Sequence, residues 1–400
     1  MVDLEFLKKQ CIEGKSKIVL LVMDGLGGLP VKDGMTELEA SRTPNFDALA
    51  KKSSGGLVDP ISTGIIPGSG PAHLGLFGYD PLKYEIGRGV LGAVGLGFDI
   101  TCDDVAIRAN FCTVDEKGIV TDRRAGRIST EICTALCKKL SGIKIPGASL
   151  FVIPEKEHRA AVIFRAKGLG ADVTDSDPQR TGVTPFDVKP LDKKSRKTSE
   201  IATAFLNSAG KVLKNEHPAN MILLRGFSKY PLLPSMQEVY KLKAAVIAVY
   251  PMYRGLAKLV GMDVLRTGET IADEFAVLRD NYGRYDFFFV HIKKTDSYGE
   301  DGNFDAKVHV IEEVDSSLPK VLDLNPGVLV VTGDHSTPAV LKSHSWHPNP
   351  LLLKSGFCRY GLMKRFTENE CANGGLGRLN SLEVMPLAMA NAQRISKFGA

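Results

Sequence analysis

The sequence lacks the cysteine patterns that form disulfide bonds in small secreted domains or bind structural zinc. Its 400 residues include seven cysteines, an odd number scattered along the chain without a Cys-x-x-Cys pair. They are Cys11, Cys102, Cys112, Cys133, Cys137, Cys358 and Cys371. This pattern argues against a disulfide framework and a zinc ribbon, and it favours reduced thiols in the cytoplasm.

Long apolar runs are also missing. The longest have about the length of a strand, so we expect no membrane span and no membrane partner. The N-terminal MVDLEFLKKQ has acids before its lysines and no long apolar core, so we expect no signal peptide. Repeats and low-complexity tracts are absent, and a composition of 44% hydrophobic and 24% charged residues indicates a globular protein of two or three domains.

The charge is mild overall but unevenly placed. The net charge is +5, yet residues 105–235 hold 22 Lys and Arg against 13 Asp and Glu, a balance of +9, which leaves −4 for the remainder. No nucleic-acid-binding motif and no interleaving of basic and aromatic residues accompanies this excess. We therefore expect no nucleic-acid partner, an expectation that a strongly salt-dependent affinity for DNA or RNA would overturn.

Three short apolar runs, each followed by an acid, are typical of buried parallel strands covered by helices on both faces. They are Ile18 to Met23 before Asp24, Phe287 to Ile292 before Asp296, and Val328 to Thr332 before Asp334. Ligands of open α/β sheets bind outside the carboxyl ends of the strands, so we expect the three acids to converge. Because the runs come from both ends of the chain, the middle must be an insertion.

The sequence therefore predicts an α/β fold with a mainly parallel sheet flanked by helices, plus a smaller inserted α/β domain. We place the larger domain at residues 1–104 and 236–400 and the insertion at residues 105–235. Residues 150–166 predict a β-hairpin, and residues 244–249 a further strand of the main sheet. Helices are expected at residues 45–52 and from Phe304 onward, where Pro319 bends or ends the second one.

Asp24 is followed by Gly25-x-Gly27, which permits two interpretations. Alone, an acid after a strand is most often a turn residue. A dinucleotide-binding loop is the other interpretation, but Pro30 holds the place of the third glycine, and Asp24 would repel a pyrophosphate.

Asp334 and His335 are adjacent after a strand, and His344 follows nine residues later. A single histidine is more often structural, but this combination suits divalent ions such as Mn, Zn or Mg.

Ser69 lies in Pro-Gly-Ser-Gly-Pro-Ala-His, and such a string is most often an ordinary loop. The functional alternative is a serine at the start of a helix that runs from His73 onward, where backbone N–H groups favour a phosphate. A serine beside a divalent metal can lose its proton and act as a nucleophile. His73, four residues on, could reach the same anion.

The order of these residues resembles the alkaline phosphatase superfamily, in which two metals surround a Ser or Thr nucleophile. Longer strings are similar to the archaeal-type 2,3-bisphosphoglycerate-independent phosphoglycerate mutases, and the similarity runs from Leu21 to Ala400. The strings are PGSGPAHLGLFGYDP from Pro67, DRRAGRIST from Asp122, TGDHSTP from Thr332, NGGLGR from Asn373 and the terminal SKFGA.

The resemblance implies an isomerase that interconverts 3-phosphoglycerate and 2-phosphoglycerate with two divalent metals and no bisphosphoglycerate. The metals would be Mn, Mg or Co, with Zn as an alternative, and the oligomeric state stays open. Matching the motifs residue by residue gives Asp24, Ser69, Asp334 and His335 to one metal, and Asp296 and His344 to the other. Ser69 would carry the phosphoryl group as a phosphoserine.

One position departs from the family pattern Asp-x-x-Gly-His-Asp, because Glu300 stands where the family has a histidine ligand. A carboxylate can still coordinate and should shift the preference toward harder ions such as Mg or Mn. The alternatives are that Asp301 or His347 takes its place, or that one metal site is weak.

Basic residues in or beside the matched strings would bind the anionic substrate, because arginine holds carboxylates and phosphates bidentately. The candidates are Arg88, Arg108, Arg123, Arg124, Arg127, Arg225 and Arg254, with His73 and Asp177. For any single arginine, a surface charge or a salt bridge is the alternative. A metal-dependent phosphatase, another phosphomutase of the superfamily and a non-catalytic relative remain the rival functions.

Overall fold

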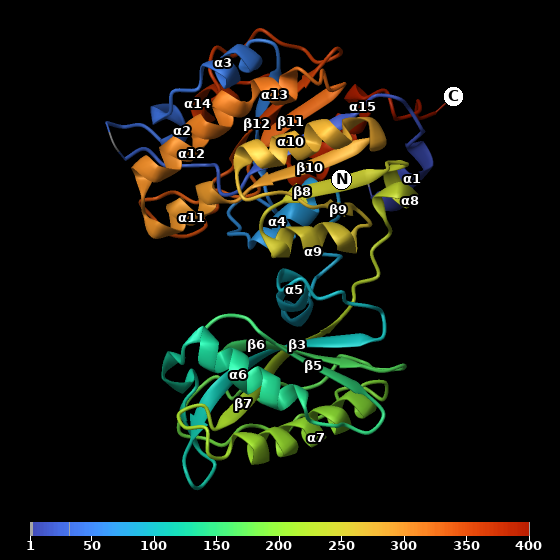
Figure 1. Ribbon diagram of the computed structural model, residues 1–400. Helices are drawn as coiled ribbons and strands as arrows, with labels where there is room; N and C mark the ends of the chain where they lie inside the picture. Colours follow the sequence, from blue (N-terminus) through green and yellow to red (C-terminus); the bar gives the residue numbers. More distant parts are fainter. Residues whose placement is uncertain (1–2, 32, 400) are drawn as a thin grey trace. The chain divides into compact units, whose positions relative to one another are not determined.

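The computed structural model describes residues 3–31 and 33–399, and the chain divides into two compact units (Figure 1). The larger unit comprises Met1–Glu85 and Leu233–Ala400, and the smaller comprises Ile86–Leu232. Within the described residues, no helix has both the length and the apolar character needed to cross a membrane.

An eight-stranded sheet forms the centre of the larger unit, and most of its strand pairs are parallel. Only the pairs of β12 with β11 and with β2 are antiparallel. In spatial order the strands are β13 (Gly377–Asn380), β2 (Ser54–Asp59), β12 (Asn349–Ser355), β11 (Val328–Thr332), β1 (Ile18–Met23), β10 (Phe287–Ile292), β8 (Ala244–Ala248) and β9 (Asp263–Leu265). The mainly parallel α/β sheet built from both ends of the chain is thus confirmed.

Strand β1 lies at the centre of this sheet and runs parallel to both neighbours. Met23 pairs with Ile292 of β10, and Val22 pairs with Thr332 of β11, so the three strands end at the same edge. All three are buried along their whole length, as their continuous apolar runs predict.

Helices cover both faces of the sheet. Alternate side chains of β1, such as Leu21, pack on one face with helices that include α10 and α12. The helices of this unit are α1 (Leu4–Gln10), α2 (Glu37–Ala40), α3 (Pro44–Ala50), α4 (Ser69–Leu76), α8 (Met236–Tyr240), α9 (Pro251–Leu259), α10 (Ile271–Asn281), α11 (Lys294–Asp301), α12 (Phe304–Ser317), α13 (Pro319–Leu322), α14 (Glu368–Ala372) and α15 (Val384–Asn391), with 3₁₀ turns η2 (Tyr282–Arg284) and η3 (Ser381–Glu383). Helix α12 ends two residues before Pro319, which begins α13, as expected.

Helix α4 begins earlier than the sequence suggested. It starts at Ser69 itself, with Gly68 as its N-cap, instead of at His73. The proline at position 71 does not prevent this, because N–H groups in the first turn of a helix have no intrahelical partner to lose.

The smaller unit is built on an antiparallel sheet. Its central strand β3 (Asp104–Val114) pairs with β4 (Val120–Asp122), β6 (Arg159–Arg165) and β7 (Met221–Lys229), and β6 pairs with β5 (Ser149–Pro154). The expected hairpin is confirmed as β5 and β6. Helices α6 (Thr130–Ser141) and α7 (Arg196–Leu213) cover one face of this sheet, while α5 (Arg88–Gly95) contacts β3 and β7 and η1 (Ala125–Arg127) follows β4.

Candidate active site

Three aspartates leave the main sheet at the same edge. Asp24 follows β1, Asp296 lies in the first turn of α11 after β10, and Asp334 follows β11. Their exposed fractions are 0%, 1% and 1%. The parallel strand order thus brings the three acids together, in agreement with the rule that sites form at carboxyl ends of strands.

Gly25 makes the close approach of the loops after β1 and β11 feasible. Its φ is +64°, and a Cβ there would lie 2.5 Å from Oγ1 of Thr337 and 2.9 Å from Oδ1 of Asp296. Its N–H donates to Oδ1 of Asp334 over 3.1 Å. Glycine is therefore required for both its backbone conformation and its small volume.

A first group of side chains surrounds Nε2 of His335. This nitrogen lies 3.3 Å from Oδ1 of Asp24, 3.1 Å from Oδ2 of Asp334 and 3.2 Å from Oγ of Ser69. Thr337 determines the tautomer, because its hydroxyl donates to Asp296 over 2.6 Å and must accept from Nδ1 of His335 at 3.0 Å. Nε2 is left with a lone pair that faces the two carboxylates.

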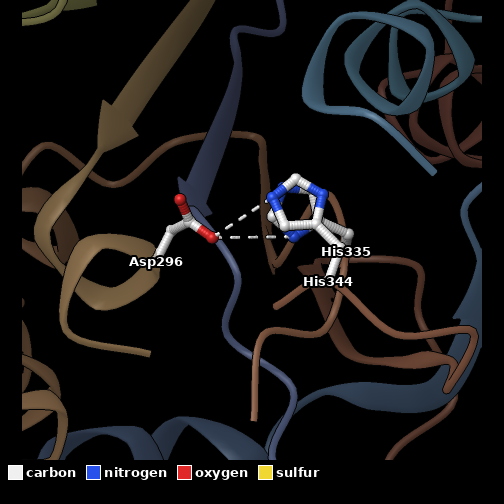
Figure 2. Close-up of side chains that lie close together, drawn as sticks. All are labelled: Asp296, His335 and His344. Atoms are coloured by element: carbon white, nitrogen blue, oxygen red, sulfur yellow. Dashed lines mark ion pairs between the residues drawn. The ribbon is translucent and has the colours of Figure 1, made fainter. Parts of the chain in front are cut away.

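A second group lies beside the first and is centred on Asp296 and His344. Figure 2 shows both of their side chains together with His335, whose ring stacks on that of His344 with centroids 3.6 Å apart. Nδ1 of His344 donates to the carbonyl oxygen of Pro67 over 2.9 Å, so Nε2 carries a lone pair. That lone pair faces Oδ1 of Asp296 at 3.6 Å and Oε1 of Glu300 at 3.8 Å.

Glu300 lies one helical turn after Asp296 on α11, with 54% of its side chain exposed. Burial, reinforced by the charge of Asp296, raises its pKa. The alternative residue His347 instead has Nδ1 3.1 Å from Oγ of Ser345 and stacks on Trp346. Glu300 therefore faces His344, and its role as a cation ligand stays a prediction.

Both groups fit divalent cations. The atoms that converge are carboxylate oxygens and imidazole lone pairs, and Oδ1 of Asp24 and Oδ2 of Asp334 are buried without any hydrogen-bond partner. Leaving such oxygens unpaired is costly unless a cation compensates them. This mixture of O and N ligands suits Mg, Mn, Co or Zn.

Lys293 is a site residue that the sequence reasoning missed. Its Nζ donates to Oδ2 of Asp24 over 3.1 Å and to Oδ2 of Asp296 over 2.5 Å, so it links acids of the two groups. Tyr253 of α9 donates to the same Asp24 oxygen. The signal for Lys293 was its place directly after a strand and three residues before Asp296. The sequence has no such signal for Tyr253. This residue lies near the site because α9 follows β8, and β8 is the sheet neighbour of β10.

The pKa values of the buried ionisable groups in the site are shifted in different directions. Burial raises the pKa of Asp24, but His291, whose Nε2 lies 3.2 Å from Oδ2, and the charge of Lys293 outweigh it and hold that pKa well below its usual range. Burial and the charge of Asp24 hold the pKa of Asp334 well above its usual range, and burial lowers the pKa of His335. A cation bound here must displace the proton of Asp334, so binding strengthens as the pH rises.

Ser69 occupies the first position of α4 and is partly exposed, so its hydroxyl is accessible beside buried acids. His73 lies one turn further and is completely buried. Its Nδ1 lies 2.8 Å from the Ser69 carbonyl oxygen and 3.2 Å from Oδ2 of Asp334. His73 therefore supports the turn that presents Ser69, and its predicted contact with substrate stays a prediction.

In the smaller unit, arginines gather around Arg108 of β3. Arg225 of β7 is its cross-strand partner, and Arg88 begins α5. Burial lowers the pKa of Arg108; the charge of Glu155 opposes this shift, and the charges of Arg159, Arg225 and Arg88 lower the pKa further. Nε of Arg108 is buried without a hydrogen-bond partner. An unpaired guanidinium N–H among like charges favours an anion.

The other residues predicted to bind substrate differ in their exposure and in their ion-pair partners. Arg123 directly follows β4, and it donates to both oxygens of Asp177 over 3.0 Å and 2.7 Å. Arg124 is exposed, and Arg127 lies 4.0 Å from Glu157. Arg254 is on α9 in the larger unit. The roles predicted for these side chains in substrate binding stay predictions.

Comparison with known proteins points to one protein family. Residues 50–220 match the family described as 2,3-bisphosphoglycerate-independent phosphoglycerate mutase. A probable 2,3-bisphosphoglycerate-independent phosphoglycerate mutase of Thermotoga sp. (strain RQ2) is 54% identical over 99% of this chain and 99% of its own. The chain belongs to the 2,3-bisphosphoglycerate-independent phosphoglycerate mutase family. A probable mutase of Aquifex aeolicus is 52% identical over 96% of this chain and 97% of its own.

A solved structure supports the same family and fold. The cofactor-independent phosphoglycerate mutase from Thermoplasma acidophilum DSM 1728 is 32% identical and has a TM-score of 0.80. The match covers 94% of this chain and 100% of that one. The resemblance to this mutase family that the motifs indicated is therefore confirmed.

Proposed function

We propose that this member of the mutase family interconverts 3-phosphoglycerate and 2-phosphoglycerate, as a step of glycolysis and gluconeogenesis in the cytoplasm. The observation that carries the proposal is the placement of Ser69. Its accessible hydroxyl lies 3.2 Å from the free lone pair of His335, beside buried acids that fit divalent cations. The relatives that are 52% and 54% identical support the substrate.

Ser69 is the nucleophile in this proposal. Its oxygen forms a bond to phosphorus while the bond from phosphorus to the glycerate oxygen breaks, and the serine proton ends on that leaving oxygen. Transfer from phosphoserine to the other hydroxyl gives the isomer and regenerates the serine. Two divalent cations, held by Asp24, Asp334 and His335 and by Asp296, His344 and Glu300, would favour the ionised serine and stabilise the entering and leaving oxygens.

The remaining residues would bind and orient the substrate. The first turn of α4 offers backbone N–H groups to the phosphoryl oxygens, and Lys293 adds a positive charge beside Asp24 and Asp296. Arg108, with Arg88 and Arg225, would hold the anionic groups of the glycerate, because the buried Nε of Arg108 has no protein partner. No bisphosphoglycerate is needed, since the serine carries the phosphoryl group from one hydroxyl to the other within each turnover.

The test is an enolase-coupled assay with 3-phosphoglycerate, run with chelator and with added Mn or Mg. We expect metal-dependent turnover that is lost in Ser69→Ala and retained in the matched control Ser62→Ala, an exposed serine of the preceding loop. Rapid quenching and mass spectrometry should find phosphate on the peptide that contains Ser69. Metal-dependent phosphate release without isomerisation would instead indicate a phosphatase of the superfamily, and no turnover with any metal would indicate a non-catalytic relative.

A further inference from the structure

Lys307 of α12 is completely buried beneath the two cation-binding groups, and no step of the proposed reaction uses it. Its Nζ donates to the carbonyl oxygens of Gly25 over 2.9 Å, Gly27 over 3.2 Å and Thr337 over 2.9 Å. Lysine is almost never fully buried unless its charge is compensated. These three carbonyl groups are therefore its principal partners.

The carbonyl groups belong to the two loops that carry cation-binding residues. Gly25 and Gly27 follow Asp24, and Thr337 follows His335. The backbone N–H of Thr337 also donates to the carbonyl oxygens of Gly25 over 3.2 Å and of Gly27 over 3.1 Å. Three carbonyl dipoles that point at one place repel each other, and the ammonium group of Lys307 removes that repulsion. Lys307 thus joins the loop after β1 to the loop after β11.

Thr337 transmits this arrangement to the side chains of both groups. Its hydroxyl donates to Asp296 over 2.6 Å and lies 3.0 Å from Nδ1 of His335. A shift of the Thr337 backbone would therefore turn the imidazole of one group and the carboxylate of the other. Outer residues that orient metal ligands in this way commonly tune metal affinity.

Two glutamates, the buried Glu37 and the partly exposed Glu368, also contact these loops. Oε1 of Glu37 lies 3.9 Å from Nζ of Lys307 and accepts from the backbone N–H of Ala339 over 2.7 Å. Oε1 of Glu368 accepts from the backbone N–H of Gly28 over 3.0 Å. Their carboxyl groups compensate the buried ammonium, so the cluster fixes the backbone that follows Asp24 and the backbone that follows His335.

We propose that Lys307 is a positioning residue that sets the cation affinity of both groups by holding the backbone of Gly25, Gly27 and Thr337. The inference rests on the proposed function only in assuming that the groups bind divalent cations. A residue that merely stabilises the core would change unfolding and leave cation affinity alone. Lys307 is distinguished by the identity of its carbonyl partners, all of which lie in the two loops.

The test measures binding of Mn²⁺ to the full-length protein directly, by calorimetry and by the electron paramagnetic resonance signal of free Mn²⁺. We expect Lys307→Met to weaken binding by about 10- to 100-fold, the range typical for residues behind metal ligands. The matched control is Val310→Ala, one turn further on the same helix, in the core and 3% exposed. It should lower the melting temperature and leave Mn²⁺ affinity within about twofold of the natural protein, a change too small to reorganise the ligands.

A double-mutant cycle that combines Lys307→Met with Thr337→Val tests whether Lys307 acts through Thr337. If Lys307 acts through Thr337, the double variant should bind Mn²⁺ no more weakly than the weaker single variant. If Lys307→Met does not fold, Lys307→Gln, which keeps one amide donor, replaces it and should give an intermediate loss. Unchanged Mn²⁺ affinity in a folded variant would overturn this inference alone. Absence of Mn²⁺ binding in the natural protein would overturn the proposed function, and this inference with it.

Discussion

Replacing Lys293 by methionine should destabilise the protein much more in the absence of bound cations than in their presence. In the structure, Nζ of Lys293 lies 3.1 Å from Oδ2 of Asp24 and 2.5 Å from Oδ2 of Asp296. The variant keeps most of the side-chain volume and removes the charge. Without cations, two buried carboxylates then lose their nearest positive charge. With cations bound, that charge is replaced, and a repulsion between Lys293 and the cations is removed.

The distances from Nζ of Lys293 to the two carboxylates give the expected size of the loss of stability. At an effective dielectric constant of about 20, separations of 3.1 Å and 2.5 Å correspond to about 5 and about 7 kcal/mol of gross attraction. Desolvation cancels much of this, and removing one partner of a buried ion pair typically costs about 3–5 kcal/mol. Because the side chain of Lys293 is 23% exposed, we expect about 3 kcal/mol.

The assay compares urea unfolding in chelator with unfolding in Mn²⁺. We expect a loss of about 3 kcal/mol in chelator and of about 1 kcal/mol or less with Mn²⁺. The difference of about 2 kcal/mol requires Mn²⁺ to bind the variant about 30-fold more tightly. Lys294→Met, which removes the next, exposed lysine, is the matched control and should change neither quantity. Equal or weaker Mn²⁺ binding by Lys293→Met would refute the reasoning.

Three further predictions concern other parts of the molecule. Glu300→His should shift metal preference from Mg toward Zn or Co, because an imidazole replaces an oxygen ligand beside His344; identical metal profiles would contradict this. Arg108→Ala should raise the ratio of phosphate release to isomerisation, measured with 3-phosphoglycerate, because a loosely held glycerate lets water compete for phosphoserine; a constant ratio would count against it. Burial raises the pKa of Glu274 to about 9, so the folded state holds a proton that the unfolded state loses, and stability should fall as the pH rises from about 4.5 to about 9. Glu274→Gln should remove this fall and stabilise the protein by about 2–3 kcal/mol in urea unfolding at pH 7, whereas an unchanged pH profile would disprove the assignment.

The central strands and the convergence of their acids were predictable because both follow from local pattern. The run Ile18 to Met23 is apolar at every position, which is typical of a strand buried on both faces. A parallel sheet then places the residues after its strands at one edge, whatever the order of the strands. The ligand-bearing loops were therefore visible before the fold was known.

Other parts of the site could not be predicted from sequence because they depend on contacts between distant segments. Lys307 looks like an ordinary helical lysine, and only the packing of α12 under the loops buries it completely. Tyr253 meets Asp24 because β8 lies next to β10, which no local pattern specifies. The start of α4 was placed four residues late, since Pro71 was an ambiguous signal that both a loop and a first helical turn tolerate.

The position of β1 at the centre of its sheet has a consequence for synthesis of the protein. Its two neighbours, β10 and β11, follow the whole smaller unit, and β10 begins 264 residues after the last residue of β1. At translation rates of about 5–20 residues per second, β10 is synthesised about 13–50 seconds after β1, so β1 has no sheet partner during that time. During that interval the six apolar residues of β1 are exposed to the ribosome surface and to chaperones. The smaller unit, Ile86–Leu232, is contiguous in sequence and by then already has all of its own strands.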